Sequence, residues 1–155
     1  MFSSDTKDRR LLEVWNQKDI PVILRRGGKG QRLRGRIPYS RDDKRWLQKK
    51  WLQNGRRLSP EWIERYRCWE LPKAWFNDFV VRALERYRKL YVIQPYREQE
   101  KCSPSCLNAR GHECECSCMG ANHGAGNDGS WFEVSDAFAV RWGERHLACR
   151  LMIAI

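Results

Sequence analysis

The clearest pattern of apolar positions lies between residues 73 and 88. Steps of one and three residues alternate along Trp75, Phe76, Phe79, Val80, Ala83, Leu84 and Tyr87. Side chains at these steps share one face of an α-helix, so the pattern predicts a central core helix over residues 73–88. Residues 6–17 carry a shorter stripe behind a cap at Asp5 or Thr6, which predicts a helix packed on a sheet. Its members are Leu11, Leu12 and Trp15.

Two further segments carry signals for the start of a helix. Ser40 followed by Asp43 has the form of a capping box, so residues 41–54 are predicted to be helical. Ser59 as a cap and Pro60 at the first helical position predict another helix directly afterwards.

Apolar and β-branched runs around turn residues predict strands. The glycine-rich turn at 27–31 separates two such runs, which predicts a β-hairpin. A second hairpin is expected to turn at Gly143-Glu144. The predicted strands cover residues 20–26, 32–40, 89–96, 130–142 and 145–153.

Taken together, these elements predict one α+β domain over residues 1–155. A chain of 155 residues has the size of a single ordinary domain. We expect an antiparallel sheet of about five strands with three or four helices. A Cys/His-rich metal-binding loop, residues 101–126, is inserted between two of the strands.

Positive charge is concentrated in one part of the chain. The net charge is +11, and residues 21–57 alone contain thirteen Lys or Arg against two Asp, a difference of +11. This window corresponds to the first predicted hairpin and the helix after it. Such a concentration is typical of a surface that binds a polyanion.

The basic window predicts nucleic-acid binding, because Arg and Lys neutralise phosphates and a two-stranded ribbon or a helix fits the major groove of DNA. Within it Arg32, Arg34 and Arg36 alternate along one predicted strand, which places their side chains on one face. Arg56 and Arg57, at the end of the window, are additional candidates. The predicted contact residues are Arg25, Arg26, Lys29, Arg32, Arg34, Arg36, Lys44, Arg45, Lys49 and Lys50.

Cysteines are crowded into residues 101–126, which contain five of the seven in the chain. Thiolates and imidazoles are the ligands that zinc prefers in closed structural sites. We expect one or two zinc ions, and the alternative metal centre is an iron–sulfur cluster. The predicted ligands are Cys102, Cys106, Cys114, Cys116, Cys118 and His123, with His112 as a seventh candidate.

A disulfide knot is the alternative without a metal. The cysteine count is odd, and the first fifteen residues lack the apolar segment of a signal peptide. A reduced, cytoplasmic protein is therefore expected, and no apolar run is long enough to span a membrane. Cys68 and Cys149 lie apart from the cluster and are expected to be buried thiols.

Two alternative functions remain open at this level. The first is a metal-dependent nuclease, because acids, amides and imidazoles surround the cysteine-rich loop. A second carboxylate site at Glu70, Asp78 or Glu98 is the other enzymatic option. The second function is an accessory protein-interaction factor, of viral or plasmid type, that binds an acidic partner surface. The residues considered for the nuclease are His112, Glu113, Glu115, Asn122, His123, Asp128 and Asp136.

Overall fold

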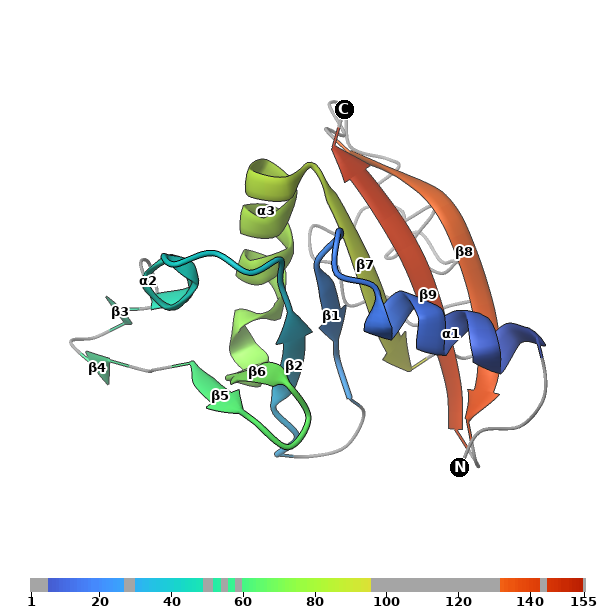
Figure 1. Cartoon of the computed structure of the whole chain (residues 1–155), viewed down its shortest axis with the longest axis horizontal. Coiled ribbons are helices and arrows are strands. Elements are labelled where there is room, and N and C mark those ends of the chain that lie inside the picture. Colours follow the sequence, from blue (N-terminus) through green and yellow to red (C-terminus); the bar gives the residue numbers. More distant parts are fainter. Residues whose placement is uncertain are drawn as a thin grey trace, which may run out of the picture.

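A computed structural model shows a mixed α+β fold built on a seven-stranded sheet (Figure 1). The strand order is β5-β6-β2-β1-β7-β9-β8. The structure describes residues 6–26, 30–48, 52–53, 56–57, 60–95, 132–142 and 145–154.

The strands of the main sheet are β1 (Val22–Leu24), β2 (Leu33–Arg36), β5 (Glu61–Ile63), β6 (Cys68–Leu71), β7 (Lys89–Pro95), β8 (Phe132–Trp142) and β9 (Arg145–Ala154). A separate antiparallel pair consists of β3 (Leu52–Gln53) and β4 (Arg56–Arg57). The helices are α1 (Thr6–Asn16), α2 (Asp43–Gln48) and α3 (Phe76–Tyr87), and the 3₁₀ turn η1 (Lys73–Trp75) leads into α3.

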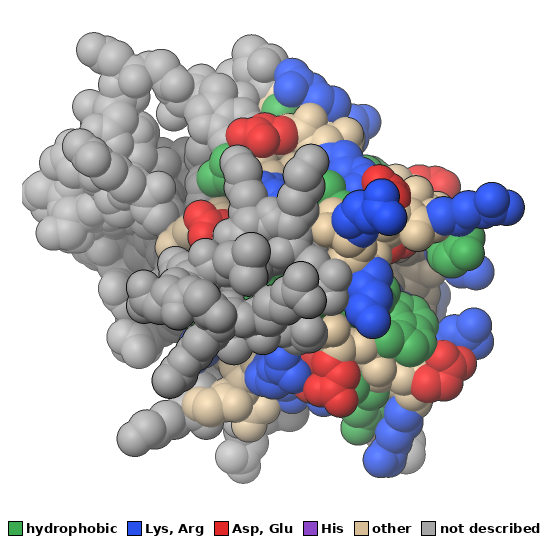
Figure 2. Space-filling view, turned by 90° about the vertical axis from the view of Figure 1, so that its left-hand side faces the viewer, with side chains coloured by type: hydrophobic (Ala, Val, Ile, Leu, Met, Phe, Trp, Pro, Cys, Tyr) green, Lys and Arg blue, Asp and Glu red, His purple; other side chains and the backbone are tan. Residues whose placement is uncertain are grey.

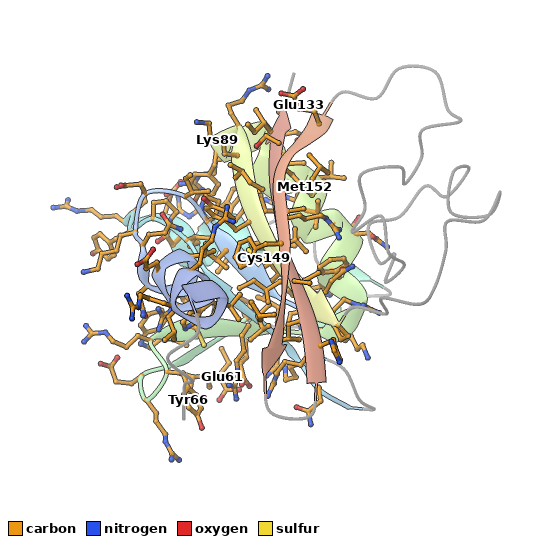
Figure 3. All side chains as sticks on the ribbon, turned by 90° about the vertical axis from the view of Figure 1, so that its right-hand side faces the viewer. Glu61, Tyr66, Lys89, Glu133, Cys149 and Met152 are labelled. Carbon is orange, nitrogen blue, oxygen red and sulfur yellow. The ribbon has the colours of Figure 1, made fainter. Side chains whose placement is uncertain are left out.

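The sheet separates α1 from α3, and Figure 3 shows the two helices on opposite sides of it. Alternation along β7 illustrates the division, since side chains point to alternate faces of a strand. Leu90 and Val92 pack in the core that contains α3, whereas Ile93 packs in the core that contains α1. Both faces of the central strands are therefore buried.

The larger core lies between α3 and the sheet. The apolar stripe predicted over residues 73–88 provides Phe76, Phe79, Val80, Ala83 and Leu84, all with no measurable exposure. Helix α2 adds Leu47 to the same core, and Trp46 packs edge-on against Phe79. Helix α3 ends at Tyr87. The next residue, Arg88, caps it in a left-handed conformation at φ 69°.

The smaller core lies between α1 and the other face. Leu11 and Val14 of α1 pack on Val22, Ile93 and Phe138. This confirms the predicted N-terminal helix and its position on the sheet. The described part of the chain contains no helix that is long and apolar enough to cross a membrane.

Several predicted elements are confirmed. Strands β1 and β2 form the first hairpin with Ile23 opposite Gly35, and β8 and β9 form the second. Strand β7 occupies most of the predicted 89–96 segment. The turns predicted at 27–31 and 143–144 lie mostly outside the described residues.

The predicted sheet has too few strands, and its purely antiparallel pairing is wrong. The observed sheet has seven strands instead of about five, and it is mixed, because β1 and β7 run parallel with Ile23 opposite Val92. The two parallel strands are joined by the long connection that ends in α3. No local sequence signal reports such pairing, since the partners are far apart in the chain.

The helix predicted over residues 41–54 is also wrong in its second half. Helix α2 ends at Gln48, and Leu52 pairs with Arg57 in the β3–β4 ladder. The intervening sequence is Asn54-Gly55, a pair that favours two-residue hairpin turns. Gly55 on its own is compatible with the end of a helix, but Asn directly before it indicates a hairpin.

The helix predicted to start at Ser59 is replaced by the β5–β6 hairpin. Trp62 and Trp69 face each other across the two strands with ring centroids 5.4 Å apart, which stabilises the pair. The turn between them contains Arg67 at φ 50°, a conformation usually taken by Gly or Asn. Because neither residue is present, the sequence gives no turn signal here.

Candidate functional site

Four arginines form a ladder on the sheet face that also carries α1. Along β2, Leu33 and Gly35 are buried toward α3, whereas Arg34 and Arg36 point to the opposite face and are only half-buried. Arg32 and Arg26 extend this row at the end of the hairpin. We call Arg26, Arg32, Arg34 and Arg36 the arginine ladder.

The ladder lies beside the region that α1 covers. Helix α1 contacts β8 and the centre of the sheet, whereas β2 and β6 lie to one side of it (Figure 1). At the boundary, the guanidinium carbon of Arg36 lies 4.3 Å from the centre of the Trp15 ring. The ladder therefore begins where the apolar packing of α1 ends.

Two glutamates from neighbouring strands pair with the ladder. Glu70 of β6 lies opposite Arg34, and its Oε2 accepts a hydrogen bond of 3.2 Å from Arg34 Nε. The same oxygen lies 3.8 Å from Arg26 Nη2. Glu61 of β5 accepts a 3.1 Å hydrogen bond from Arg32. These carboxylates lie outside the basic window, so the window alone overstates the charge of this surface.

The two ion-paired glutamates differ in exposure. The Glu70 side chain is 17% exposed and holds Arg26 and Arg34 in place, whereas the Glu61 side chain is 63% exposed. Exposed pairs contribute little free energy, because water competes for both groups. Arg32 is therefore the member of the ladder that exchanges its carboxylate for another anion most readily.

An exposed aromatic ring completes the surface. Tyr66, in the turn between β5 and β6, is 40% exposed, and Arg34 lies over its ring at 4.3 Å from the centroid. Arg65 lies at 5.4 Å from the same centroid. Figure 3 shows Tyr66 and Glu61 at the same end of the molecule, far from Lys89. Cation–π contacts of this kind orient guanidinium groups at a surface.

Arg36 has a different role from the other members. It donates hydrogen bonds to the Trp15 carbonyl at 2.8 Å, to Asn16 Oδ1 at 3.0 Å and to the Tyr66 carbonyl at 2.9 Å. It thereby joins the end of α1 to the β5–β6 turn. Burial lowers the pKa of Arg36, but a guanidinium remains charged at neutral pH.

The whole surface retains an excess of positive charge. The ladder and the β5–β6 hairpin together contain six arginines, the four of the ladder plus Arg65 and Arg67, against the three glutamates 61, 64 and 70. Arg65 and Arg67 are exposed in the turn. Figure 2, which views the side carrying α2 and β5, shows blue basic, red acidic and green hydrophobic side chains intermixed.

The other predicted contact residues do not join this surface. Arg25 points to the opposite face, where it lies 5.7 Å from the centre of the Phe76 ring. Lys44 and Arg45 are exposed on α2, which packs on the α3 side through Leu47. Three further predicted residues lie outside the described part of the chain, namely Lys29, Lys49 and Lys50.

The sequence interpretation missed Arg65, Tyr66, Arg67 and Trp15 as members of the surface. The signal for the first three was the run Glu64-Arg65-Tyr66-Arg67, in which one aromatic residue stands among three charged residues. It was assigned to a helix and so was not associated with the ladder. Trp15 belongs to the surface only through tertiary contact.

The two cysteines outside the cluster are buried and free of disulfides, as predicted. Burial raises the pKa of the Cys68 thiol, although the nearby Arg34 and Arg36 act in the opposite direction. A buried thiol with a raised pKa is a poor nucleophile and a poor metal ligand. Cys68 therefore contributes to packing close to Arg34 and Arg36.

The predicted metal ligands cannot be placed in the fold. All six of them, and His112, lie in residues 101–126, outside the described part. The described residues contain no group of three His, Cys, Asp or Glu side chains that would hold a metal ion. Pro95 pairs with Leu147 and Phe132 with Ala154, so the residues on either side of 96–131 lie at opposite ends of β9.

The predicted catalytic groups are likewise mostly outside the described residues. Of the nuclease candidates, only Asp136 lies on a described strand, and its side chain is not among those described. Of the second carboxylate set, Glu70 forms ion pairs with the ladder and Asp78 lies exposed on α3, apart from each other. Glu98 falls outside the described part.

Comparisons with protein families, with curated proteins and with solved structures find no match for this chain. The function must therefore be argued from the surface itself.

Proposed function

We propose that the protein binds nucleic acid through the arginine ladder and the β5–β6 turn. The observation that carries this proposal is the stacking of Arg34 on exposed Tyr66, on a surface with six arginines and three glutamates. Guanidinium groups bind phosphates through paired hydrogen bonds, and an excess of them attracts a polyanion. The partly exposed Arg32 and the exposed Arg65 and Arg67 contact phosphates, while Glu70 positions Arg34 behind them.

Binding is tested by fluorescence anisotropy with a labelled random-sequence oligonucleotide. Affinity is expected to fall by about 10³ to 10⁵ between ~50 and ~200 mM salt if six to ten phosphates are contacted, and by less for fewer contacts. Absence of binding at ~50 mM salt contradicts the proposal. It would instead favour a partner with an acidic protein surface.

A matched pair of double variants locates the surface. Arg65→Ala/Arg67→Ala removes two charges beside the ladder, and Lys44→Ala/Arg45→Ala removes two from α2 on the other face. The first variant is expected to weaken binding and to lower the salt dependence by up to ~2 counterions, whereas the second changes little. If the α2 variant has the larger effect, the binding surface lies on α2 and not on the ladder.

We also propose that residues 101–126 hold one or two zinc ions. Five thiols and His123 match the ligand preference of zinc, and thiolate-rich sites are usually structural and not catalytic. When bound, zinc supplies a cross-link between distant parts of this segment. The named ligands are Cys102, Cys106, Cys114, Cys116, Cys118 and His123.

Elemental analysis of protein purified without added metal tests the zinc proposal. One or two zinc per chain are expected, and Cys116→Ser or Cys118→Ser should release zinc. Iron with inorganic sulfide would reassign the segment to an iron–sulfur cluster. A preparation with all thiols free and no metal would contradict both assignments.

A further inference from the structure

The position of β1 and β2 in the sheet decides how nucleic acid approaches the ladder. Strand β2 lies between β6 and β1, and β1 lies between β2 and β7. The β1–β2 hairpin therefore lies inside the sheet and does not project from it as a separate ribbon. At ~4.8 Å between strands, seven strands span roughly 30 Å. The major groove of DNA is only ~12 Å wide, so this hairpin does not enter it.

The β5–β6 hairpin at the edge of the sheet carries two of the three large exposed aromatic side chains of the described residues. Trp62 and Tyr66 are 44% and 40% exposed, and Tyr39 is the third large exposed apolar residue among those described. Tyr66 lies on the ladder face with Arg34 over one side of its ring. Basic and aromatic groups are thus adjacent at the edge of the sheet, where Arg65, Tyr66 and Arg67 are exposed.

Adjacent basic and aromatic groups are suited to a strand whose bases are unpaired. Base stacking on an aromatic ring stabilises single-strand binding with little dependence on sequence, and it requires a base face that is accessible. In a duplex these faces are covered by neighbouring base pairs. A duplex would therefore use only the charges of this surface, whereas a single strand would use the charges and the ring.

We propose that the ladder face binds single-stranded nucleic acid, with a base stacked on Tyr66 and phosphates held by Arg32, Arg65 and Arg67. This inference rests on the proposed function. It extends that function by specifying the strandedness of the ligand, which the charge of the chain does not determine.

The test compares one labelled sequence as single-stranded RNA, single-stranded DNA and duplex DNA, at the same salt concentration. At least one of the two single-stranded ligands is expected to bind at least about tenfold more tightly than the duplex. A preference for RNA or for DNA identifies the sugar that is recognised, and either result supports the inference.

Variants of the ring provide the second measurement. Tyr66→Ala is expected to weaken single-strand binding by at least about fivefold and duplex binding by much less. Tyr66→Phe keeps the ring and should bind like the original protein. Tyr39→Ala removes an exposed ring in the loop between β2 and α2, and is expected to leave the ratio of single-strand to duplex affinity unchanged.

Two results separate failure of this inference from failure of the proposed function. If the duplex binds as tightly as the single strands and Arg65→Ala/Arg67→Ala weakens all three, nucleic-acid binding stands and the preference for single strands is wrong. If none of the three ligands binds at low salt, both proposals fail. A loss of single-strand binding in Tyr66→Phe equal to that in Tyr66→Ala also contradicts stacking.

Discussion

Arginine side chains in this protein perform distinct tasks that their sequence positions do not reveal. Arg34 and Arg26 share Glu70, Arg32 pairs with exposed Glu61, and Arg36 binds three oxygen atoms of α1 and the β5–β6 turn. The local sequence is a simple alternation in β2. The tasks differ because the side chains meet different elements: Arg26 and Arg34 meet β6, Arg32 meets β5, and Arg36 meets α1 and the β5–β6 turn.

Arg36→Met is expected to lower the free energy of unfolding by about 2 kcal/mol. It removes three hydrogen bonds from a charged donor, and the partly exposed setting reduces their contribution. Arg32→Met is the matched control, because it removes one exposed ion pair and should change stability by less than about 0.5 kcal/mol. Urea denaturation measures both. Equal effects would show that Arg36 does not join the two elements.

Tyr87 is the second residue with a measurable individual effect. Its ring packs edge-on against Trp46, and burial raises the pKa of its hydroxyl to about 12, against the opposing influence of Arg86. Within the described part of the chain, the buried hydroxyl oxygen has no hydrogen-bond partner. The folded state therefore favours the neutral phenol.

The raised pKa of Tyr87 has a definite sign for stability. The stability that the neutral Tyr87 hydroxyl contributes is complete below pH 10, the usual pKa of tyrosine. This stability is lost as the pH rises through the folded-state pKa of about 12. Tyr87→Phe should reduce this alkaline loss and leave stability at pH 7 unchanged or higher by up to about 1 kcal/mol. Denaturant unfolding at pH 8 and pH 11 checks this, with Tyr39→Phe as the exposed control. A clear loss at pH 7 would mean that the hydroxyl is hydrogen-bonded.

The elements with the longest apolar periods were predicted correctly, whereas the β5–β6 hairpin was not. Helix α3 and hairpin β8–β9 have long repeating patterns, so burial of one face fixes their type. The β5–β6 hairpin is too short for such a pattern, and its turn residue Arg67 takes a conformation that its type rarely adopts. Its pairing is set by Trp62 against Trp69, which is a contact between strands.

Gly35 in β2 provides a test at the level of the element. A Cβ atom at this position would lie 3.5 Å from Ile23 Cδ1 and 3.8 Å from Phe79 Cζ, both ordinary contact distances. Gly35→Ala is therefore expected to raise the free energy of unfolding by about 0.4–1 kcal/mol, because the unfolded chain loses freedom. Thermal or urea unfolding measures the change.

Gly35→Leu serves as the contrasting variant. The larger side chain exceeds the space between Ile23 and Phe79, and overpacking is expected to cost about 1–3 kcal/mol. If Gly35→Ala were destabilising by more than about 1 kcal/mol, the strand would require a glycine for its backbone conformation.

The whole molecule combines a basic sheet face with a cysteine-rich segment that follows β7 in the sequence. The flanking residues Pro95 and Phe132 lie at opposite ends of β9. A metal ion within a long connection reduces the freedom of the unfolded chain and couples binding to folding.

Chelation is therefore expected to destabilise the protein. If zinc is bound, a strong chelator should lower Tm by at least about 5 °C, and added zinc should restore it. Cys116→Ser should already have the lower Tm, with little further change on chelation. An unchanged Tm in the original protein, with zinc removed, would limit the metal to a role outside folding stability.

The sequence by itself determined the helices and strands with a sustained apolar period, the buried state of Cys68 and Cys149, and the alternation of Arg32, Arg34 and Arg36. Each of these follows from local geometry, in which neighbours in the chain define a face. The parallel pairing of β1 with β7 and the β5–β6 hairpin were decided by tertiary structure.

The candidate surface shows the same division. The four arginines of the ladder were predicted from the sequence, but Arg65 and Arg67 were not. Glu61, Glu70, Tyr66 and Trp15 reach the ladder only through the fold. Contacts between distant segments depend on how both faces of the sheet are buried together, and no local pattern encodes that requirement. The charge was thus a property of the sequence, and its arrangement on one face of the sheet was a property of the tertiary structure.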